Sequence, residues 1–166
     1  MIEVFHGSYT KVDKPDLSFS RKMLDFGTGF YVTPVYDEQA VAWAMRWLRR
    51  NRPAVVNRYA FHDELLPELG VRVRDFPAYD REWLRFVADN RAGVQQDGYD
   101  IVRGGIANDK VFNTLELFFE KLISEDEALA RLKFEKPNHQ ICIRRQDLID
   151  RLLVFKFAGE VPNASR

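Results

Sequence analysis

The stretch DFGTGFYVTP, residues 25–34, combines two glycines, two adjacent aromatic residues and a proline. Glycine adopts backbone angles that other residues avoid, so the GTG run at 27–29 predicts a tight turn. The residues that follow predict a strand, which places Phe30 and Tyr31 on opposite faces and ends at Pro34. This stretch therefore fixes where the chain turns into a strand and presents an aromatic side chain.

Two motifs that the letters of this stretch suggest are excluded by their surroundings. A kinase DFG needs an upstream glycine-rich loop, a strand lysine and a catalytic loop, and the 24 residues before Asp25 cannot contain them. A dinucleotide fingerprint needs GxGxxG between a strand and a helix, whereas here GTG precedes a strand and lacks the third glycine. The glycines are therefore expected to shape a turn that brings the backbone close to another group.

The flanking segments predict short strands and helices that interleave without regular βαβ spacing. A long irregular connection over 7–29 follows the first predicted strand, and connections of that length are usually functional or mobile. The predicted strands lie at 2–6, 30–33, 54–62, 101–102, 139–145 and 154–161, and the predicted helices at 35–51, 79–91, 110–122, 124–134 and 146–153. The class is α+β, with short strands split by helical insertions, in a single domain over residues 1–166.

The segment 35–51 has apolar residues at helical spacing, which predicts one amphipathic helix that begins near Asp37. Its apolar face would consist of Ala40, Trp43, Ala44, Trp47 and Leu48. Arg46, Arg49 and Arg50 lie on the other side, where basic residues in a last turn suit the helix dipole. A phosphate site is the alternative interpretation of these arginines.

Composition narrows the class of protein. Lysine plus arginine and aspartate plus glutamate number 25 each, so no overall basic field indicates nucleic-acid or membrane binding, although local patches can exist. Cys142 is the only cysteine, which excludes an intramolecular disulfide, and its strand context favours a core residue over a nucleophile. The N-terminus has no secretory pattern and no window is apolar enough to span a membrane, so we expect a cytoplasmic protein.

Histidines offer the clearest candidate for chemistry. His6, His62 and His139 are the only three, and no pair has the HxxxH or HExxH spacing of a metal site, so we expect no metal. A lone histidine is more often structural than catalytic. His6, however, ends a predicted strand directly before Gly7 and Ser8, where backbone and hydroxyl groups are free to meet a ligand.

Three short motifs in this order resemble those of the ADP-ribosyltransferase superfamily: FHGS on a first strand, GTGFYVTP on a second, and a late NHQICI strand followed by a short helix and LLVFKF. Within it, the chain resembles the branch of diphtheria-type toxins and poly(ADP-ribose) polymerases. It is most similar to a family of small uncharacterised bacterial proteins with the pattern DFG-x-GFY followed by QA-x-x-WA, from about residue 3 to about residue 157. The resemblance implies split antiparallel β-sheets with helical insertions.

The resemblance also implies roles for the residues at the first two motifs. His6 would hydrogen-bond a ribose hydroxyl of NAD, and Gly7 would present backbone groups to the nicotinamide carboxamide. Ser8 would be a neighbouring polar contact. Tyr31 would stack on the nicotinamide ring, so that the site positions the oxocarbenium-like cation formed when nicotinamide departs.

The third motif departs from the family pattern. The catalytic glutamate of the polymerases is replaced by Gln140, or by His139 in a register shifted by one residue, and we favour Gln140. A glutamine amide can hydrogen-bond a ribose hydroxyl but cannot act as a general base. Asp109 is the acid to test as a substitute, with a helix N-cap as its alternative role. Arg21 could bind the pyrophosphate, with a solvated surface arginine as the alternative.

Two classes of function follow from the resemblance. The first is an NAD-dependent mono-ADP-ribosyltransferase, a toxin or conflict-system effector that modifies a protein or nucleic-acid acceptor and has an antitoxin-like partner. The second is a non-catalytic member of the fold that binds NAD or a partner, which the missing glutamate favours. A lesser alternative is an NAD-consuming RNA 2'-phosphotransferase activity, which would need a basic RNA-binding surface.

Overall fold

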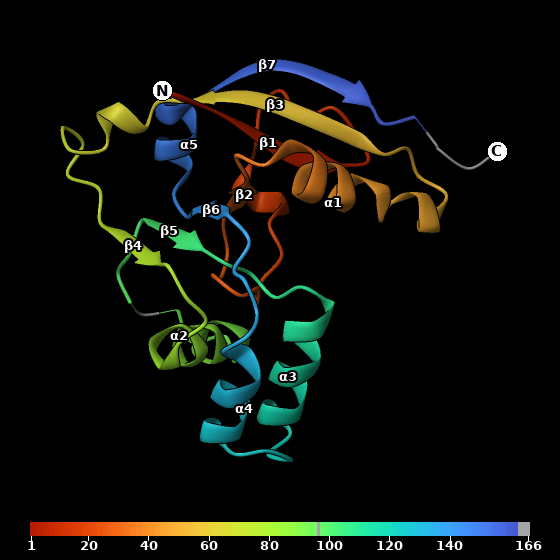
Figure 1. Cartoon of the computed structure of the whole chain (residues 1–166). Helices are drawn as coiled ribbons and strands as arrows, with labels where there is room; N and C mark the ends of the chain where they lie inside the picture. The colour runs from red at the N-terminus through yellow and green to blue at the C-terminus, as the bar shows by residue number, and fades with distance from the viewer. Residues whose placement is uncertain (96, 163–166) are drawn as a thin grey trace.

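The chain folds around two β-sheets, as the computed structural model shows over residues 1–95 and 97–162 (Figure 1). The first sheet is antiparallel, in the order β1-β3-β7, and the second has the order β2-β6-β5-β4. The strands are β1 (Ile2–Ser8), β2 (Phe30–Val32), β3 (Val55–Phe61), β4 (Val73–Phe76), β5 (Ile101–Gly104), β6 (Gln140–Ile143) and β7 (Leu153–Glu160).

Helices pack on both sheets (Figure 1). The regular helices are α1 (Ala42–Met45), α2 (Arg81–Arg91), α3 (Asp109–Phe119), α4 (Glu125–Leu132) and α5 (Gln146–Leu152). Shorter turns are the 3-10 turns η1 (Leu17–Phe19), η3 (Leu48–Arg50) and η4 (Asp63–Leu65) and the π-helical turn η2 (Tyr36–Val41).

The two sheets meet where β1 and β2 touch and then separate. Phe5 and Thr33 exchange both main-chain hydrogen bonds, with N···O distances of 2.8 and 2.9 Å, in an isolated antiparallel bridge. On its other side β2 pairs with β6, with Val32 opposite Ile141. Strands β1, β2 and β6 therefore lie side by side at this point, which we call the split.

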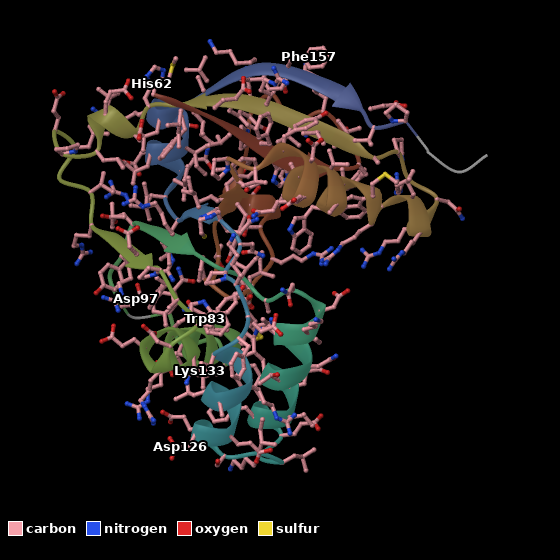
Figure 2. The ribbon with its side chains drawn as sticks, viewed as in Figure 1. His62, Trp83, Asp97, Asp126, Lys133 and Phe157 are labelled. Carbon is pink, nitrogen blue, oxygen red and sulfur yellow. The ribbon has the colours of Figure 1, made fainter. Side chains whose placement is uncertain are left out.

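Three groups of buried apolar side chains hold the layers together. One lies between the two sheets and includes Val4, Phe30 and Tyr59. A second lies between the second sheet and helices α2, α3 and α4, and Figure 2 shows Trp83 within it. A third, around Phe5, packs η2 and α1 against the first sheet. Because β2 residues alternate between faces, Phe30 joins the first group and Tyr31 contacts the second.

The structure confirms the α+β class and corrects two details of it. The second sheet is mixed rather than antiparallel, because β4 pairs in parallel with β5. The segment 35–51 is not one regular helix but the succession η2, α1 and η3. The helical segment begins at Tyr36, close to the predicted start near Asp37, but its N-cap is Val35, which makes no side-chain capping bond.

Other helix predictions hold closely. Asp80 caps α2 by accepting a hydrogen bond from the backbone N–H of Trp83, and Ser124 caps α4 by accepting one from Glu127 N–H. No helix within residues 1–95 and 97–162 is long and apolar enough to cross a membrane.

Candidate functional site

The DFGTG turn before β2 is fastened from three sides. Gly27 has φ of +75°, a conformation that favours glycine. The buried Asp25 carboxylate accepts from Arg91 Nε at 2.6 Å and from the backbone N–H of Ala107 at 2.7 Å. Arg144, at the end of β6, donates from Nε to the Phe26 carbonyl at 2.8 Å.

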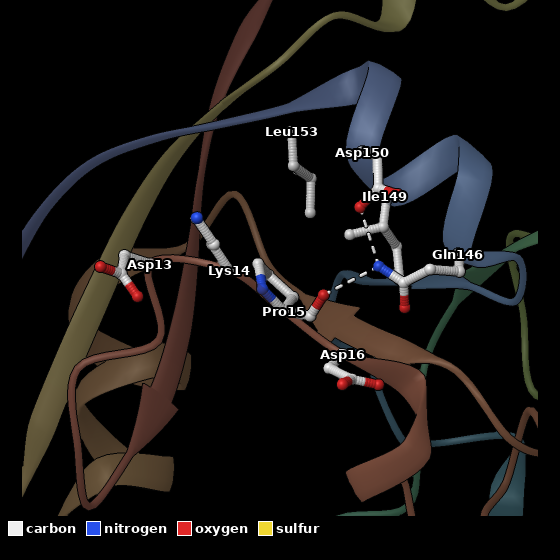
Figure 3. A pocket seen from close by; sticks show the side chains of 8 residues that line it. All are labelled: Asp13, Lys14, Pro15, Asp16, Gln146, Ile149, Asp150 and Leu153. Atoms are coloured by element: carbon white, nitrogen blue, oxygen red, sulfur yellow. Dashed lines mark hydrogen bonds between the residues drawn. The ribbon is translucent and has the colours of Figure 1, made fainter.

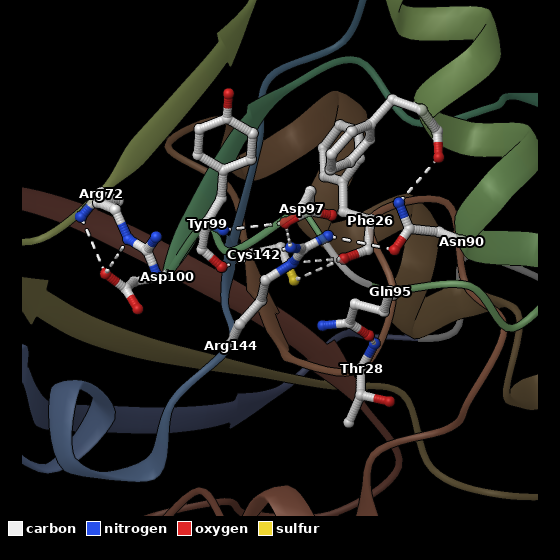
Figure 4. Close-up of polar contacts among 12 residues, drawn as sticks. Phe26, Thr28, Arg72, Asn90, Gln95, Asp97, Tyr99, Asp100, Cys142 and Arg144 are labelled. Carbon is white, nitrogen blue, oxygen red and sulfur yellow. Dashed lines mark hydrogen bonds and ion pairs between the residues drawn. The ribbon is translucent and has the colours of Figure 1, made fainter.

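The Arg144 guanidinium is engaged in hydrogen bonds and an ion pair within the protein, as Figure 4 shows. Its side chain is 3% exposed and forms an ion pair with Asp97. It also donates to the Asn90 Oδ1 atom at 3.2 Å and to the Tyr99 carbonyl at 3.3 Å. One buried guanidinium thus ties the turn to α2, β5 and β6.

Tyr31 is part of this turn through its side chain. Its hydroxyl donates to the Gly27 carbonyl at 2.7 Å and accepts from the Phe26 N–H at 3.1 Å. Its ring is nearly parallel to that of Phe26, with centroids 6.4 Å apart, and burial raises the pKa of the Tyr31 hydroxyl well above its ordinary value of 10. The residue is half-buried, and its hydroxyl closes the turn.

His6 lies across the split from the Tyr31 backbone. Its Nδ1 is 2.8 Å from the Tyr31 carbonyl, which can only accept, so Nδ1 carries the proton and Nε2 is an acceptor in the neutral ring. Desolvation lowers the pKa of His6 from its ordinary value of 6.5, against the opposing effect of the hydrogen bond to Tyr31. The ring packs on Phe30, with centroids 4.5 Å apart, so it lies on the opposite face of β2 from the Tyr31 ring.

Gly7 directs unpaired main-chain groups into the split. It follows Phe5 by two residues in β1, so its N–H and C=O point to the side on which Phe5 bonds Thr33. In the part of the chain that the structure describes, neither group has a partner on that side. On the sheet face, a Cβ at Gly7 would lie 2.4 Å from the Ala40 carbonyl and 2.6 Å from Ala44 N, so only glycine fits beneath this helical segment.

Gln140 begins β6 and continues its pairing with β2 past Val32, so it lies next to Thr33. Its side chain is buried, with Nε2 3.1 Å from Gln39 of η2. In the better of its two orientations, the Gln39 amide donates from its nitrogen to Thr33 Oγ1 at 2.6 Å and to the His139 carbonyl at 2.9 Å. The Gln39 amide oxygen then accepts from the His139 N–H at 3.1 Å. Gln39 therefore fastens η2 to the start of β6.

A cavity of about 340 Å³ adjoins this contact. One wall is the outward face of η2 and α1, and the other is formed by the segments before α3 and β6. Trp43 is 36% exposed and carries the Arg46 guanidinium over its ring at 3.9 Å. The lining residues include Glu38, Gln39, Trp43, Arg46, Asn108 and His139. Neither His6 nor Gly7 lines this cavity, because η2 and α1 lie between it and β1.

The remaining predicted site residues differ in their surroundings. Ser8 is buried at the end of β1, and Arg21 is exposed in the connection before the DFGTG turn. Asp109 is not the N-cap of α3, because Asn108 caps that helix by accepting from the Val111 N–H at 3.0 Å. The Asp109 side chain is 98% exposed and lies 3.6 Å from Arg46.

Cys142 is fully buried beside Tyr31, and burial raises its pKa to about 12, which confirms a core residue rather than a nucleophile. Within the described ranges, no three histidine, cysteine, aspartate or glutamate side chains gather into a group that could hold a metal ion.

A second cavity, of about 540 Å³, lies between the long connection and α5 (Figure 3). Gln146 crosses it by donating to the Pro15 carbonyl at 2.9 Å and to Asp150 at 2.8 Å, which anchors the connection to α5. None of the predicted site residues lines this cavity.

Sequence reasoning missed Gln39, Trp43 and Glu38 as candidate site residues. Gln39 and Trp43 belong to the QA-x-x-WA pattern, and Trp43 was assigned to the buried face of a regular helix. Ala40 and Ala44 of that face are buried, but Trp43 is 36% exposed and lines the cavity, which helical spacing alone does not predict.

Comparison with known proteins gives one match. The family model described as "Protein of unknown function (DUF3990)" matches residues 2–155, which include the predicted site residues from His6 to Gln140. Neither the search of curated proteins nor the search of solved structures gave a match.

Proposed function

We propose that this chain, which belongs to the DUF3990 family, is an NAD-dependent mono-ADP-ribosyltransferase whose nicotinamide site lies at the split between its sheets. The single observation that carries the proposal is the unpaired N–H and C=O of Gly7 beside the acceptor Nε2 of His6. An edge of this kind is complementary to a primary carboxamide, which has one carbonyl and one NH₂ group to exchange with it.

His6 supports the same ligand through its tautomer. Because Nδ1 donates to the Tyr31 carbonyl, Nε2 is free to accept a hydrogen bond from a ribose hydroxyl. The lowered pKa of His6 keeps the ring neutral near pH 7, so this acceptor is retained. Arg21, exposed in the connection before the DFGTG turn, is the residue we assign to the pyrophosphate.

The reaction would break the bond between C1' of the ribose and the nicotinamide nitrogen, and nicotinamide would leave with the bonding electrons. The acceptor nucleophile would then bond to C1' and lose a proton. Gln140 can hold a ribose hydroxyl but cannot take that proton. Glu38 lines the cavity on the other side of η2 and α1 from β1, and Asp109 is solvent-exposed, so neither is assigned as the base and the proton would pass to solvent.

A second candidate is a member of the fold that binds NAD or a protein partner without turnover. It is favoured by the burial of Gln140 beside Gln39 and by the absence of a carboxylate at that position. The RNA 2'-phosphotransferase alternative would use the same NAD site with a phosphorylated RNA.

Calorimetric titration with NAD, combined with nicotinamide release in the presence of cell extract, separates these functions. We expect wild type to bind NAD and His6→Ala to lose most of that binding, whereas His139→Ala, a substitution of an exposed histidine, keeps it. Binding without nicotinamide release would favour the non-catalytic candidate. Absence of NAD binding by the folded wild-type protein would contradict the transferase and the NAD-binding form of the second candidate, and would leave only a protein-binding function.

A further inference from the structure

An arginine-rich and aromatic surface lies beside the cavity, along α1, η3 and the end of β1. We call it the arginine–aromatic surface and define it by Tyr9, Trp43, Arg46, Trp47, Arg49, Arg50 and Arg52. Tyr9 is 39% and Trp43 36% exposed, and all four arginines are exposed. We propose that this surface binds single-stranded nucleic acid.

The charge of the surface is locally unbalanced although the whole chain is neutral. Residues 39–62 contain no aspartate or glutamate. Among the ion pairs of the described residues, only Arg46 of this surface has a carboxylate partner, Asp109, at 3.6 Å. An anionic partner would therefore find three arginines with no competing acid.

The arginines are arranged in a way that suits phosphate. Arg46 lies over Trp43 at 3.9 Å, Arg50 over Trp47 at 5.2 Å and Arg52 over Tyr9 at 5.2 Å. A guanidinium stacked on a ring uses its face, which leaves the N–H groups in its plane free to donate to phosphate oxygens. Stacking also limits the rotamers of these long side chains, so less entropy is lost when a phosphate binds.

The aromatic rings favour a single strand over a duplex. Tyr9 and Trp47 form a pair with centroids 4.6 Å apart, and Trp43 lies farther along the same segment. Unpaired bases can stack on aromatic rings and on the guanidinium planes that lie over them, whereas the bases of a duplex are already stacked on each other. An acidic protein segment would use the charges of this surface but not its rings.

The position of the surface links it to the proposed activity. Trp43 and Arg46 also line the cavity of about 340 Å³, so a bound strand would pass its mouth. If the chain transfers ADP-ribose, which rests on the proposed function, this strand is the acceptor class that the surface selects. The binding itself does not depend on NAD, and the experiment below omits NAD so that the two proposals can fail separately.

Fluorescence anisotropy with labelled oligothymidylate and oligouridylate of about 15 nucleotides tests the proposal. With three or four phosphate contacts, the slope of log K against log salt for wild type should be about −2 to −3. Substitution of Arg49, Arg50 and Arg52 together by alanine should move this slope toward zero by about 2. Trp43→Ala should weaken binding about 5- to 100-fold and leave the slope unchanged.

A matched variant removes the same charge elsewhere. Arg85, Arg131 and Arg151 are exposed on α2, α4 and α5, and their replacement by alanine should leave binding at the wild-type level. Circular dichroism of both triple variants checks that they are folded. Equal affinity of the two triple variants would overturn the proposal, as would tighter binding of a duplex or equally effective competition by polyglutamate. Preference for uridylate or thymidylate identifies RNA or DNA as the ligand.

Discussion

The DFGTG turn and the end of β1 lie next to each other but differ in whether their polar groups are hydrogen-bonded within the protein. In the turn, Asp25, the Phe26 carbonyl and the Tyr31 hydroxyl all have partners within the protein. At the end of β1, the N–H and C=O of Gly7 have none among the described residues. Buried polar groups are normally paired, so the turn is a framework; under the proposed function, a ligand would pair with the main-chain groups of half-buried Gly7 at the end of β1.

Tyr31 belongs to both regions. Its side chain belongs to the turn, through Gly27 and Phe26, and its carbonyl belongs to the split, where it orients His6. Substitutions that alter one region at a time test whether the other region is affected.

Arg144→Met should give the largest effect, a loss of about 3 to 5 kcal/mol in the free energy of unfolding. The substitution leaves the Asp97 carboxylate without its ion-pair partner and removes a donor from the Phe26 carbonyl. Urea denaturation measures the loss. The control Arg151→Met, on the exposed side of α5, should change stability by less than about 0.5 kcal/mol. A similar small change for Arg144→Met would contradict the framework role of the turn.

Gln140→Glu changes a residue beside the split and should raise nicotinamide release about a hundredfold if the split is the catalytic site. The carboxylate would supply the general-base or charge-stabilising group that glutamine lacks. Release of nicotinamide from NAD is the measurement, and His139→Glu, one residue earlier and exposed, is the matched control. An unchanged rate for Gln140→Glu would show that another group already does this work or that the site lies elsewhere.

Features that depend on local sequence could be predicted, and features that depend on contacts between distant segments could not. The α+β class, the GTG turn and the buried Cys142 could be predicted because turn chemistry and local periodicity determine them. The pairing of β4 in parallel with β5 could not be predicted, because it depends on contacts between distant segments. The split itself followed only from resemblance, since no local pattern indicates that β1 and β2 share a single bridge.

The candidate site was predictable only in part. His6 and Gly7 were identified from their place at the end of a strand, and the structure places them at the split. Trp43 was missed because helical spacing gives the apolar face but not how far a side chain at its border is exposed, and Ala40 and Ala44 of the same face are buried as predicted. The tyrosine hydroxyl was assigned no structural role, because its partners, the Phe26 N–H and the Gly27 carbonyl, become neighbours only when the turn closes.

Tyr31→Phe separates the two roles of this residue. Removal of the hydroxyl leaves the Gly27 carbonyl and the Phe26 N–H unpaired in a buried turn, which should cost about 1 to 2 kcal/mol of stability. The ring and the carbonyl that orients His6 remain, so NAD affinity should stay close to that of wild type. Urea denaturation and calorimetry give both quantities. Loss of NAD affinity without loss of stability would instead place the hydroxyl in the ligand site.

The smallest expected effect is the contribution of His6 to the pH dependence of stability. Its pKa is lowered in the folded protein from the ordinary value of 6.5, because desolvation disfavours the charged ring. When the pKa of a group is lower in the folded than in the unfolded chain, protons bind the unfolded chain first as pH falls. This binding stabilises the unfolded state relative to the folded state. The His6 contribution should therefore be constant above pH 6.5 and should decrease stability as pH falls below it, through the lowered pKa.

Urea denaturation of wild type and His6→Asn at a series of pH values tests this effect, with the exposed His139→Asn as the control. Stability of His6→Asn should fall less steeply than that of wild type below pH 6.5, and His139→Asn should keep the wild-type slope. NAD at saturating concentration should steepen the wild-type decrease, because a protonated Nε2 no longer accepts from the ribose hydroxyl and the ligand then stabilises the fold less. If NAD leaves the slope unchanged, His6 belongs to the framework, and the unpaired groups of Gly7 alone distinguish the end of β1 from the turn.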